Sequence, residues 1–264
     1  MSDRRFDHPT QALVTGASSG IGLAVAKLLA DQGISLVITG RNEENLRKLE
    51  GELKEKVHVE MIVADLTDAK QLDLILEAIE RLSCDLVINN AGFGGYGNAI
   101  EAPIERTQKM IQLDVEAMAL VALKAGHAMV KNHIKGTILN VSSAASFFPF
   151  PGFSVYAASK GFVNQFSLAL NEELKEFGVK VLTSCPGVVK TYFAHTAGGE
   201  YLENAKGFSK PMTAEFAALE IWKQIKSGKL LHIFDWRYRW MVSFSKMVPK
   251  PLLFFLLKQS LKRR

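Results

Sequence analysis

Residues 11–30 read QALVTGASSGIGLAVAKLLA, an apolar run followed by a turn with three glycines and a longer apolar stretch. The run predicts a buried β-strand, and the stretch after the turn predicts a helix. Such a turn presents backbone N–H groups and the positive end of the helix dipole to a phosphate. Gly16 allows a tight turn, whereas Gly20 and Gly22 allow close approach of a ligand and of the helix to the sheet. A turn that binds nothing is the alternative, but three glycines are more than it requires.

The alternation of strand and helix patterns continues along the chain and predicts an α/β fold. The predicted strands cover residues 11–15, 35–39, 57–63, 85–89, 136–142, 179–184 and 230–234. The predicted helices cover residues 23–30, 43–56, 69–82, 104–133, 155–177 and 214–226. We therefore expect one Rossmann-type, doubly wound domain over residues 1–235, with about seven parallel strands and helices on both faces. Ligands bind such domains beyond the carboxyl ends of the strands.

The end of the second strand bears on the choice of cofactor. In dinucleotide-binding folds an acidic residue there binds the ribose 2′-hydroxyl, whereas a nearby arginine favours a 2′-phosphate. Here Thr39 and Gly40 are followed by Arg41, with no acidic residue. The sequence therefore favours NADP(H) over NAD(H). The alternative is a solvated arginine at the start of a helix.

The residues after the third strand allow two interpretations. Asp65 and Leu66 lie there, where Asp65 is in a position to hydrogen-bond the adenine edge of a dinucleotide. Alternatively, Asp65 helps to cap the next helix, for which Thr67 and Asp68 are competing candidates. The sequence favours neither interpretation over the other.

Further ligand-binding residues are predicted at the same edge of the sheet. The fourth strand ends in Asn89-Asn90-Ala91-Gly92, whose small side chains leave room for a ligand. Ser143 ends the fifth strand, and residues 186–191 follow the sixth. The segment 192–211 is polar and aperiodic, and a loop of that length usually forms a lid or a binding loop.

Tyr156 and Lys160 are four residues apart and share one face of a predicted helix. Together with Ser143 they offer a phenol, an ammonium and a hydroxyl for proton transfer. We expect the charge of Lys160 to lower the pKa of the Tyr156 phenol, which is ordinarily about 10. The spacing alone is weak, because chance gives about 0.4 such pairs in this composition. The convergence with the other strand-end motifs carries the prediction.

Taken together, these motifs resemble those of the short-chain dehydrogenase/reductase family over roughly residues 11–234. The resemblance implies an oxidoreductase that transfers hydride between a nicotinamide and a carbonyl or alcohol group. It implies that Tyr156 exchanges a proton with the substrate oxygen, that Ser143 hydrogen-bonds this oxygen, and that Lys160 holds the nicotinamide ribose. We also expect a homo-oligomer. The expected cofactor-binding residues are Gly16, Ser18, Ser19, Gly20, Ile21, Gly22, Arg41, Asp65, Leu66, Asn90, Ala91, Gly92, Tyr156, Lys160, Val189 and Thr191.

One position departs from the family pattern. The helix before the active site usually carries an Asn that supports a water chain to the lysine, and this chain has Asp114 there. A carboxylate near Lys160 would keep the ammonium protonated and partly offset its field at Tyr156. We therefore count Asp114 among the catalytic candidates and expect activity with a shifted pH optimum. The alternative is that Asp114 only packs the helix.

Composition limits the class of protein. The 264 residues are 48% hydrophobic and 22% charged, which is ordinary for a globular chain. The N-terminus lacks the apolar core of a signal peptide. Cys84 and Cys185 lie in or beside strand-like runs, which predicts buried thiols in a reducing compartment. We therefore expect a cytoplasmic protein. The six histidines show no metal-ligand spacing, so no metal site is predicted.

The positive charge is concentrated in a C-terminal extension, residues 236–264. It contains 8 basic and no acidic residues, which leaves 24 of the 32 basic residues against 27 acidic ones elsewhere. This distribution argues against a body that binds nucleic acid. The apolar run Leu252–Leu257 is too short to span a bilayer. The extension either contacts the inner membrane surface peripherally, or packs on its own body or on a partner subunit.

The substrate is less well defined. Aromatic residues near the predicted mouth suggest an apolar or lipid-like small molecule, although aromatics also fill cores. The competing function is a cofactor-binding regulatory or scaffold protein that has lost turnover, and the intact Ser143, Tyr156 and Lys160 favour the enzyme. The aromatic residues concerned are Phe93, Tyr96, Phe147, Phe148, Phe150, Phe153 and Phe193.

Overall fold

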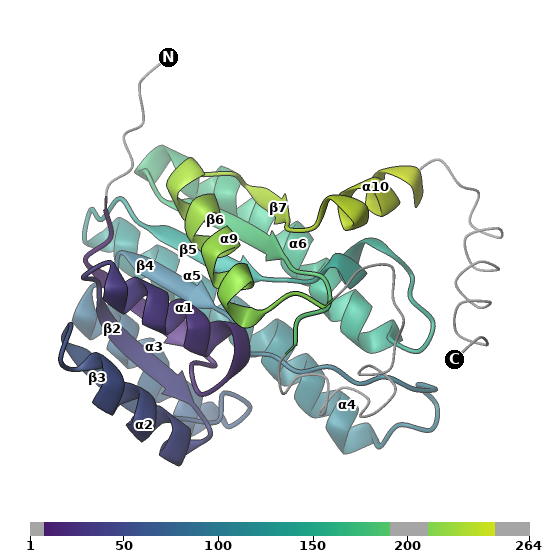
Figure 1. The fold of residues 1–264 in the computed structure, drawn as a ribbon, viewed down its shortest axis with the longest axis horizontal. Helices are drawn as coiled ribbons and strands as arrows, with labels where there is room; N and C mark the ends of the chain where they lie inside the picture. The colour runs from purple at the N-terminus through teal and green to yellow at the C-terminus, as the bar shows by residue number, and fades with distance from the viewer. Residues whose placement is uncertain (1–7, 191–210, 246–264) are drawn as a thin grey trace.

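The computed structural model describes residues 8–190 and 211–245 (Figure 1). Thr191, almost all of the predicted lid and the extension after Ser245 lie outside these residues. In chain order the elements are β1 (Gln11–Thr15), α1 (Gly20–Asp31), β2 (Ser35–Gly40), α2 (Glu43–Leu53), β3 (Val59–Val63), α3 (Ala69–Leu82), β4 (Leu86–Asn89), α4 (Ile104–Ile111), η1 (Gln112–Ala117), α5 (Met118–Lys131), β5 (Thr137–Val141), η2 (Ala144–Phe147), α6 (Ser154–Leu174), η3 (Lys175–Phe177), β6 (Lys180–Cys185), α9 (Ala214–Ser227), β7 (Leu231–Ile233) and α10 (Trp236–Ser245).

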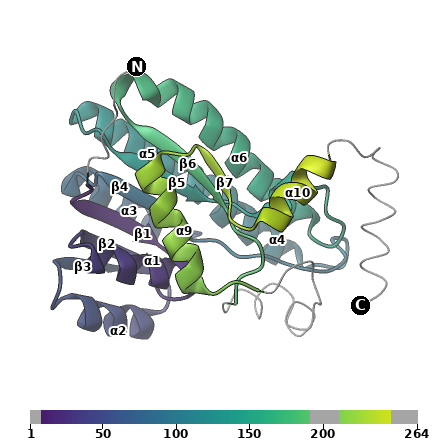
Figure 2. The ribbon, with the colours of Figure 1, turned by 45° about the horizontal axis from the view of Figure 1, so that its top comes forward.

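The seven strands form one parallel sheet in the order β3-β2-β1-β4-β5-β6-β7. Successive residues of a strand point to opposite faces, so β1 presents Ala12 and Val14 to one face and Leu13 to the other. Helices α1, α2 and α9 cover the first face, and α3, α5 and α6 cover the second (Figures 1 and 2). Burial on both faces explains why the central strands are predominantly apolar. The predicted α/β, doubly wound fold is confirmed.

Most predicted elements agree with the structure to within one helical turn. The helix predicted over residues 104–133 differs, because a π-helical segment, η1, lies between α4 and α5. An extra residue in a helical turn re-aims the side chains that follow, and such segments often occur at functional sites. Asp114 lies on η1 and is fully buried. The helix predicted over residues 155–177 ends at Leu174 and continues as the short 3-10 helix η3.

The beginning of the basic extension is the helix α10, which packs on the body of the protein. Val242 of α10 is buried in a small apolar cluster with Phe148, Cys185 and Ile233. Both cysteines are buried and free, as predicted. Over its first ten residues the extension therefore follows the interpretation in which it packs on its own body. No helix in the described part of the chain is long and apolar enough to cross a membrane.

Candidate active site

The predicted site residues meet at the carboxyl ends of the four central strands, β1, β4, β5 and β6. These strands are adjacent and in register, so that Asn89 pairs with Asn140 and Asn140 pairs with Thr183. The glycine-rich turn follows β1, the Asn90–Gly92 segment follows β4, and Ser143 follows β5. After β6, Val189 forms a parallel bridge with Met212, so the segment that follows this strand is anchored next to α9. Parallel topology thus brings segments from four parts of the chain to one edge.

The glycine-rich turn is a tight cradle that leaves no room for side chains at its glycine positions. Gly16 and Gly20 have φ angles of +68° and +57°, which favour glycine. A Cβ atom on Gly16 would lie 2.9 Å from Asn90 Nδ2. A Cβ on Gly22 would meet the Gly16 carbonyl oxygen. Glycine at these positions therefore lets the turn pack closely against the Asn90–Gly92 segment and against the start of α1.

Thr15 joins the ends of β1 and β4, a role that the sequence analysis did not single out. Its Oγ1 accepts hydrogen bonds from the backbone N–H groups of Asn90 and Ala91, both at 2.9 Å. Asn90 Nδ2 donates in return to the Thr15 carbonyl oxygen at 3.0 Å. The sequence signal that could have identified this role is a hydroxyl residue at the end of an apolar strand, immediately before the glycine-rich turn. These bonds fix the wall of the cradle.

The N-terminus of α1 fits a diphosphate. Its N-cap residue Ser19 makes no side-chain capping hydrogen bond, and the first turn has no acidic residue. The positive end of the helix dipole is therefore not compensated by a side chain of this turn. Together with the glycine cradle, this arrangement has the shape and charge that a dinucleotide pyrophosphate requires.

Arg41 and Ser18 lie at the end of β2, where a ribose 2′-substituent is expected. A Cβ on Gly40 would lie 3.0 Å from Ser18 Oγ, which places this hydroxyl over the strand end. The Arg41 side chain is 62% exposed, and its Nη1 lies 3.7 Å from Asp65 Oδ2. An exposed pair at this distance contributes at most about 1 kcal/mol. It does not prevent Arg41 from binding a phosphate.

The structure excludes Asp65 as the N-cap of the helix that follows β3. Asp68 caps α3 by accepting a hydrogen bond from Gln71 N, so Asp65 is not the cap. Instead, Asp65 Oδ1 accepts bonds from Thr67 N at 3.0 Å and Thr67 Oγ1 at 2.8 Å. Burial opposes ionisation of Asp65, but the Thr67 bonds and the Arg41 charge outweigh it and keep its pKa below the ordinary value. The side chain of Leu66 is buried in the core, which leaves only its backbone for a cofactor.

Tyr156, Lys160 and Ser143 lie together and are nearly inaccessible, with exposures of 8%, 5% and 9%. Lys160 Nζ donates to the Val141 carbonyl oxygen at 3.2 Å and lies 5.8 Å from the centre of the Tyr156 ring. Ser143 Oγ accepts a hydrogen bond from Ala145 N at 3.1 Å. The α6 spacing and the β5 end thus bring a phenol, an ammonium and a hydroxyl to one place.

The expected lowering of the Tyr156 pKa is not what the structure gives. Burial raises the pKa of Tyr156 above its ordinary value, and this effect outweighs the hydrogen bond with Ser143, which lowers it. The carboxylate of Asp114 also raises the pKa. The physical reason is that a buried phenolate loses its hydration, while the charge of Lys160 faces that of Asp114. Tyr156 is therefore neutral near neutral pH, which is the form that donates a proton.

Asp114 lies behind Lys160 and is not displaced from the site. Its Oδ1 is 3.7 Å from Lys160 Nζ and accepts a hydrogen bond from Phe93 N at 3.2 Å. A Cβ on Gly92 would lie 2.5 Å from this oxygen and 3.1 Å from Lys160 Nζ, so only glycine fits between them and the cradle. Burial raises the pKa of Asp114 to about 6, although Lys160 and the Phe93 N–H lower it. Its Oδ2 has no hydrogen-bond partner among the described residues.

The predicted aromatic residues divide into three groups. The Tyr96 and Phe150 rings lie 4.9 and 5.5 Å from the Phe153 ring, which is 5.8 Å from that of Tyr156. Phe147 and Phe148 belong to the cluster beneath α10, which Phe150 also contacts, whereas Phe93 packs against the core. Phe193 lies outside the described residues. Only the first group forms an apolar approach to the phenol.

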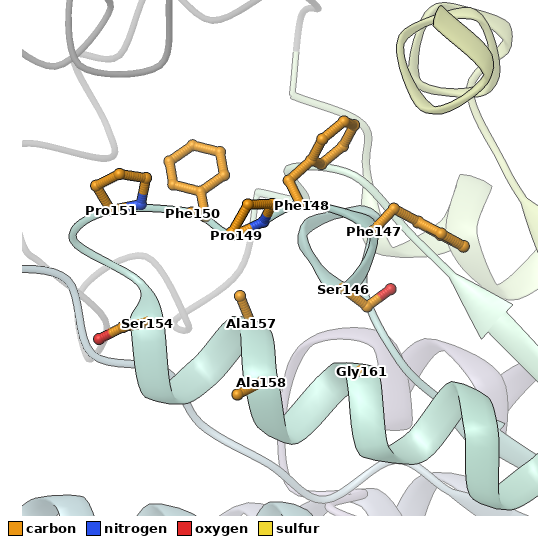
Figure 3. Close-up of a pocket in the computed structure, with 10 residues that line it drawn as sticks. All are labelled: Ser146, Phe147, Phe148, Pro149, Phe150, Pro151, Ser154, Ala157, Ala158 and Gly161. Carbon is orange, nitrogen blue, oxygen red and sulfur yellow. The ribbon is translucent and has the colours of Figure 1, made fainter. Parts of the chain in front are cut away.

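An open apolar groove of about 540 Å³ lies between the loop after β5 and α6 (Figure 3). Neither Tyr156 nor Lys160 lines it. The residues of α6 that do line it are offset from these two by helical spacing and so face another side of the helix. The groove is therefore not the place of proton transfer. Its lining residues are Ser146, Phe147, Phe148, Pro149, Phe150, Pro151, Ser154, Ala157, Ala158 and Gly161.

Comparisons with known proteins agree with this geometry. A family model for short chain dehydrogenases matches residues 10–201. The sulfoacetaldehyde reductase 2 of Chromohalobacter salexigens is 34% identical over 200 residues, which are 73% of this chain and 79% of the relative. A short-chain dehydrogenase from Sphingobium yanoikuyae, solved in complex with NADPH, superimposes with a TM-score of 0.82 at 28% identity, over 90% of this chain and 93% of that one. The bulky-bulky ketone specific alcohol dehydrogenase of Comamonas testosteroni has a TM-score of 0.77 at 27% identity, over 86% of each chain.

Proposed function

Because this chain belongs to the short-chain dehydrogenase/reductase family and is an oxidoreductase of alcohol and carbonyl groups, we propose that it uses NADP(H) and acts on an apolar, lipid-like substrate. The observation that supports the activity most strongly is the meeting of Tyr156, Lys160 and Ser143 beside the glycine cradle. The nicotinamide supplies the hydride when it is bound. The residues of the chain supply binding, orientation and the proton.

Each residue at the site has a proposed role in carbonyl reduction. Tyr156, neutral and buried, donates its proton to the carbonyl oxygen while the carbonyl carbon accepts the hydride. Ser143 donates a hydrogen bond to the same oxygen and so favours the charge that develops there. Lys160 is positioned by Val141 and Asp114 to hold the nicotinamide ribose. In alcohol oxidation the same groups act in the opposite direction.

An apolar substrate is supported by the aromatic array that approaches Tyr156. The rings of Phe150 and Tyr96 each lie within 6 Å of the Phe153 ring, which in turn lies within 6 Å of the Tyr156 ring. Such a wall offers apolar area and no charged group, which suits a hydrocarbon or aryl chain beside the carbonyl. The structurally similar alcohol dehydrogenase of Comamonas testosteroni is specific for bulky-bulky ketones.

The proposal is tested by NADPH oxidation with a panel of ketones and aldehydes of increasing alkyl length. We expect turnover to rise with apolar size, because each buried methylene contributes roughly 0.8 kcal/mol. Charged carbonyl compounds of similar size serve as the matched control and should be poor substrates. Absence of turnover with every carbonyl compound would favour a cofactor-binding protein without catalysis.

The cofactor preference gives a separate prediction. Arg41→Ala should weaken NADPH binding by roughly 10- to 100-fold, because it removes a charge-assisted hydrogen bond worth about 1.5–3 kcal/mol. The affinity for NADH, which lacks the 2′-phosphate, should change little. Both dissociation constants are measured by fluorescence titration. Arg47→Ala is the control, because Arg47 is equally exposed on the neighbouring α2 and pairs with Glu43. Equal losses for both cofactors would contradict the assignment of Arg41 to the phosphate.

A further inference from the structure

Helix α10 has one face on the protein and one face in solvent. Trp236, Trp240 and Phe244 are spaced by four residues and are 58%, 68% and 62% exposed. Residues at this spacing form a continuous stripe on a helix, so these three rings constitute one exposed aromatic stripe. On the other face, Val242 is buried and Tyr238 and Met241 pack against the cluster that contains Phe148. The helix therefore has two apolar faces. One packs on the body of the protein, and the other, the aromatic stripe, is not covered by any described residue.

The orientation of the aromatic stripe is fixed relative to the active site. The Tyr238 ring lies so close to Gly187 that a Cβ there would overlap it. Arg239 Nη1 donates to the carbonyl oxygens of Ile233 and Phe234, at 2.8 and 3.3 Å, just after β7. These contacts attach α10 to the segments that follow β6 and β7, at the edge of the sheet where the site residues meet. The figures show α10 at that end of the molecule (Figures 1 and 2).

The C-terminal extension that contains the stripe carries charge of only one sign in its sequence, which is positive. Residues 236–264 carry 8 basic and no acidic residues, whereas the rest of the chain has an acidic excess. The exposed Arg237 lies 5.7 Å from the centre of the Trp236 ring. Tryptophan prefers the boundary between water and hydrocarbon, and basic residues beside an apolar face are attracted to anionic lipids. This combination of charge and aromatic side chains matches an anionic bilayer surface.

We propose that the aromatic stripe of α10 seats this protein on an anionic lipid surface, with the strand carboxyl ends next to the bilayer. The stripe inserts at the level of the lipid head groups, where Arg237, beside Trp236, meets the lipid phosphates and carboxylates. The loop with Phe147, Phe148 and Phe150 packs against α10 and continues through Phe153 to Tyr156. A membrane-dissolved carbonyl compound therefore has an apolar path to the phenol. This part of the inference rests on the proposed function.

The first experiment measures flotation of the full-length protein with vesicles of phosphatidylcholine alone or with about 30% phosphatidylserine, where each basic residue adds about 1 kcal/mol. We expect at least about tenfold stronger binding to the anionic vesicles, and at least about a tenfold loss in Trp236→Ala/Trp240→Ala/Phe244→Ala. The control variant, Leu74→Ala/Phe177→Ala/Phe216→Ala, truncates exposed apolar residues on three other elements. It should bind as the unaltered protein does.

The second experiment uses tryptophan fluorescence as a depth probe. The chain has three tryptophans: Trp222 is buried in the core at 6% exposure, and the other two lie on the stripe. Brominated phosphatidylcholine, mixed into the anionic vesicles, should quench the emission of the unaltered protein. In Trp236→Phe/Trp240→Phe the remaining emission comes from Trp222 and should not be quenched. The intrinsic probe thus reports on the stripe itself.

Several results would overturn the proposal. Equal binding of the triple variant and the unaltered protein would show that α10 is not the contact, even if residues 246–264 bind lipid. A lack of vesicle binding by the unaltered protein would also overturn the proposal, whatever the reason for it. A change of oligomeric state in the triple variant, measured by light scattering, would assign the stripe to a second copy of the chain.

Turnover separates a failure of this inference from a failure of the proposed function. Without vesicles, the triple variant should reduce a water-soluble ketone at a rate within about twofold of the unaltered protein, because the three side chains face solvent and contribute little to the packing of the body. With a long-chain ketone in anionic vesicles, its rate should fall at least about tenfold. Equal rates with the vesicle-bound ketone would overturn the substrate path. If the unaltered protein reduces neither ketone, the proposed function fails, whereas the flotation result still decides the lipid contact.

Discussion

The variant Tyr156→Phe is expected to lose about 10²- to 10⁴-fold in kcat for carbonyl reduction, the usual contribution of a positioned general acid. The substitution removes only the hydroxyl. The ring keeps its contact with Phe153 and its place 5.8 Å from Lys160 Nζ. Loss of the hydrogen bond with Ser143 should lower the free energy of unfolding by about 1 kcal/mol. The variant should therefore fold and bind the cofactor, but it should be unable to donate the proton in carbonyl reduction.

The measurement is single-turnover reduction at saturating NADPH, together with a fluorescence titration of NADPH. The dissociation constant should stay within about threefold of the unaltered value, since removing an interaction that is made only in the transition state lowers kcat without weakening binding. Tyr238→Phe is the matched control, because it also removes a phenolic hydroxyl but retains the ring that covers Gly187. If Tyr156→Phe kept more than a tenth of the activity, another group would have to supply the proton.

The second large effect is expected for Asp114→Asn, and it depends on pH. Asp114 has a pKa of about 6 in the folded protein, so its carboxylate forms as the pH rises through this value. The carboxylate raises the pKa of Tyr156. The variant should therefore lack the inflection near pH 6 in its rate profile, and its alkaline limb for reduction should move to lower pH. An unchanged profile would contradict any electrostatic influence of Asp114 on Tyr156.

The same shift predicts a change in stability with a definite sign. Burial raises the pKa of Asp114 from 3.8 to about 6, so the folded state holds this proton more tightly than the unfolded state. Stability is thus lost as the pH rises from about 4 to 6 and is not regained above it. The shift corresponds to an upper value of about 3 kcal/mol. Asp114→Asn removes this loss. The free energy of unfolding of the variant, relative to that of the unaltered protein, should therefore be higher at pH 8 than at pH 4 by roughly 1–3 kcal/mol.

Urea unfolding of both proteins at pH 4 and pH 8 measures this difference. Comparing the two pH values cancels any effect of the Asn side chain that does not titrate. Asp73→Asn is the control, because Asp73 is exposed on α3 and far along the chain from the site. A stability difference that does not vary with pH would mean that Asp114 is not the titrating group. Activity and unfolding thus test one carboxyl group by independent readouts.

Local sequence was sufficient for the order of elements and for most of the site. Apolar runs and helical spacing depend on nearest neighbours along the chain, and they predicted all seven strands. The glycines of the cradle were predictable because their φ angles and the lack of space around them exclude side chains. The four-residue spacing of Tyr156 and Lys160 fixes their common face whatever surrounds the helix. The parallel topology then required the strand-end motifs to meet.

Only the tertiary structure decided the pKa shifts of the buried groups and the roles of residues for which the sequence left two interpretations open. The sign of the Tyr156 pKa shift follows from its burial, and that burial arises from segments far apart in the sequence. The same holds for Asp114, whose place behind Lys160 depends on the π-helical turn η1 and on the space left by Gly92. Desolvation is a property of the whole environment of an atom, and no local pattern encodes it.

Residues with two competing local roles were likewise settled by contacts distant in sequence. Asp65 and Asp68 were both plausible caps, and the geometry of the chain leaving β3 gave the cap to Asp68. The aromatic residues near the mouth were indistinguishable by type, yet some face Tyr156 and others lie beneath α10. The sequence by itself determined the fold, the cradle and the pairing of Tyr156 with Lys160, because these depend on local spacing and on strand order. Only the tertiary structure decided charge states, packing partners and the exposed face of α10, because these depend on which atoms exclude water from which others.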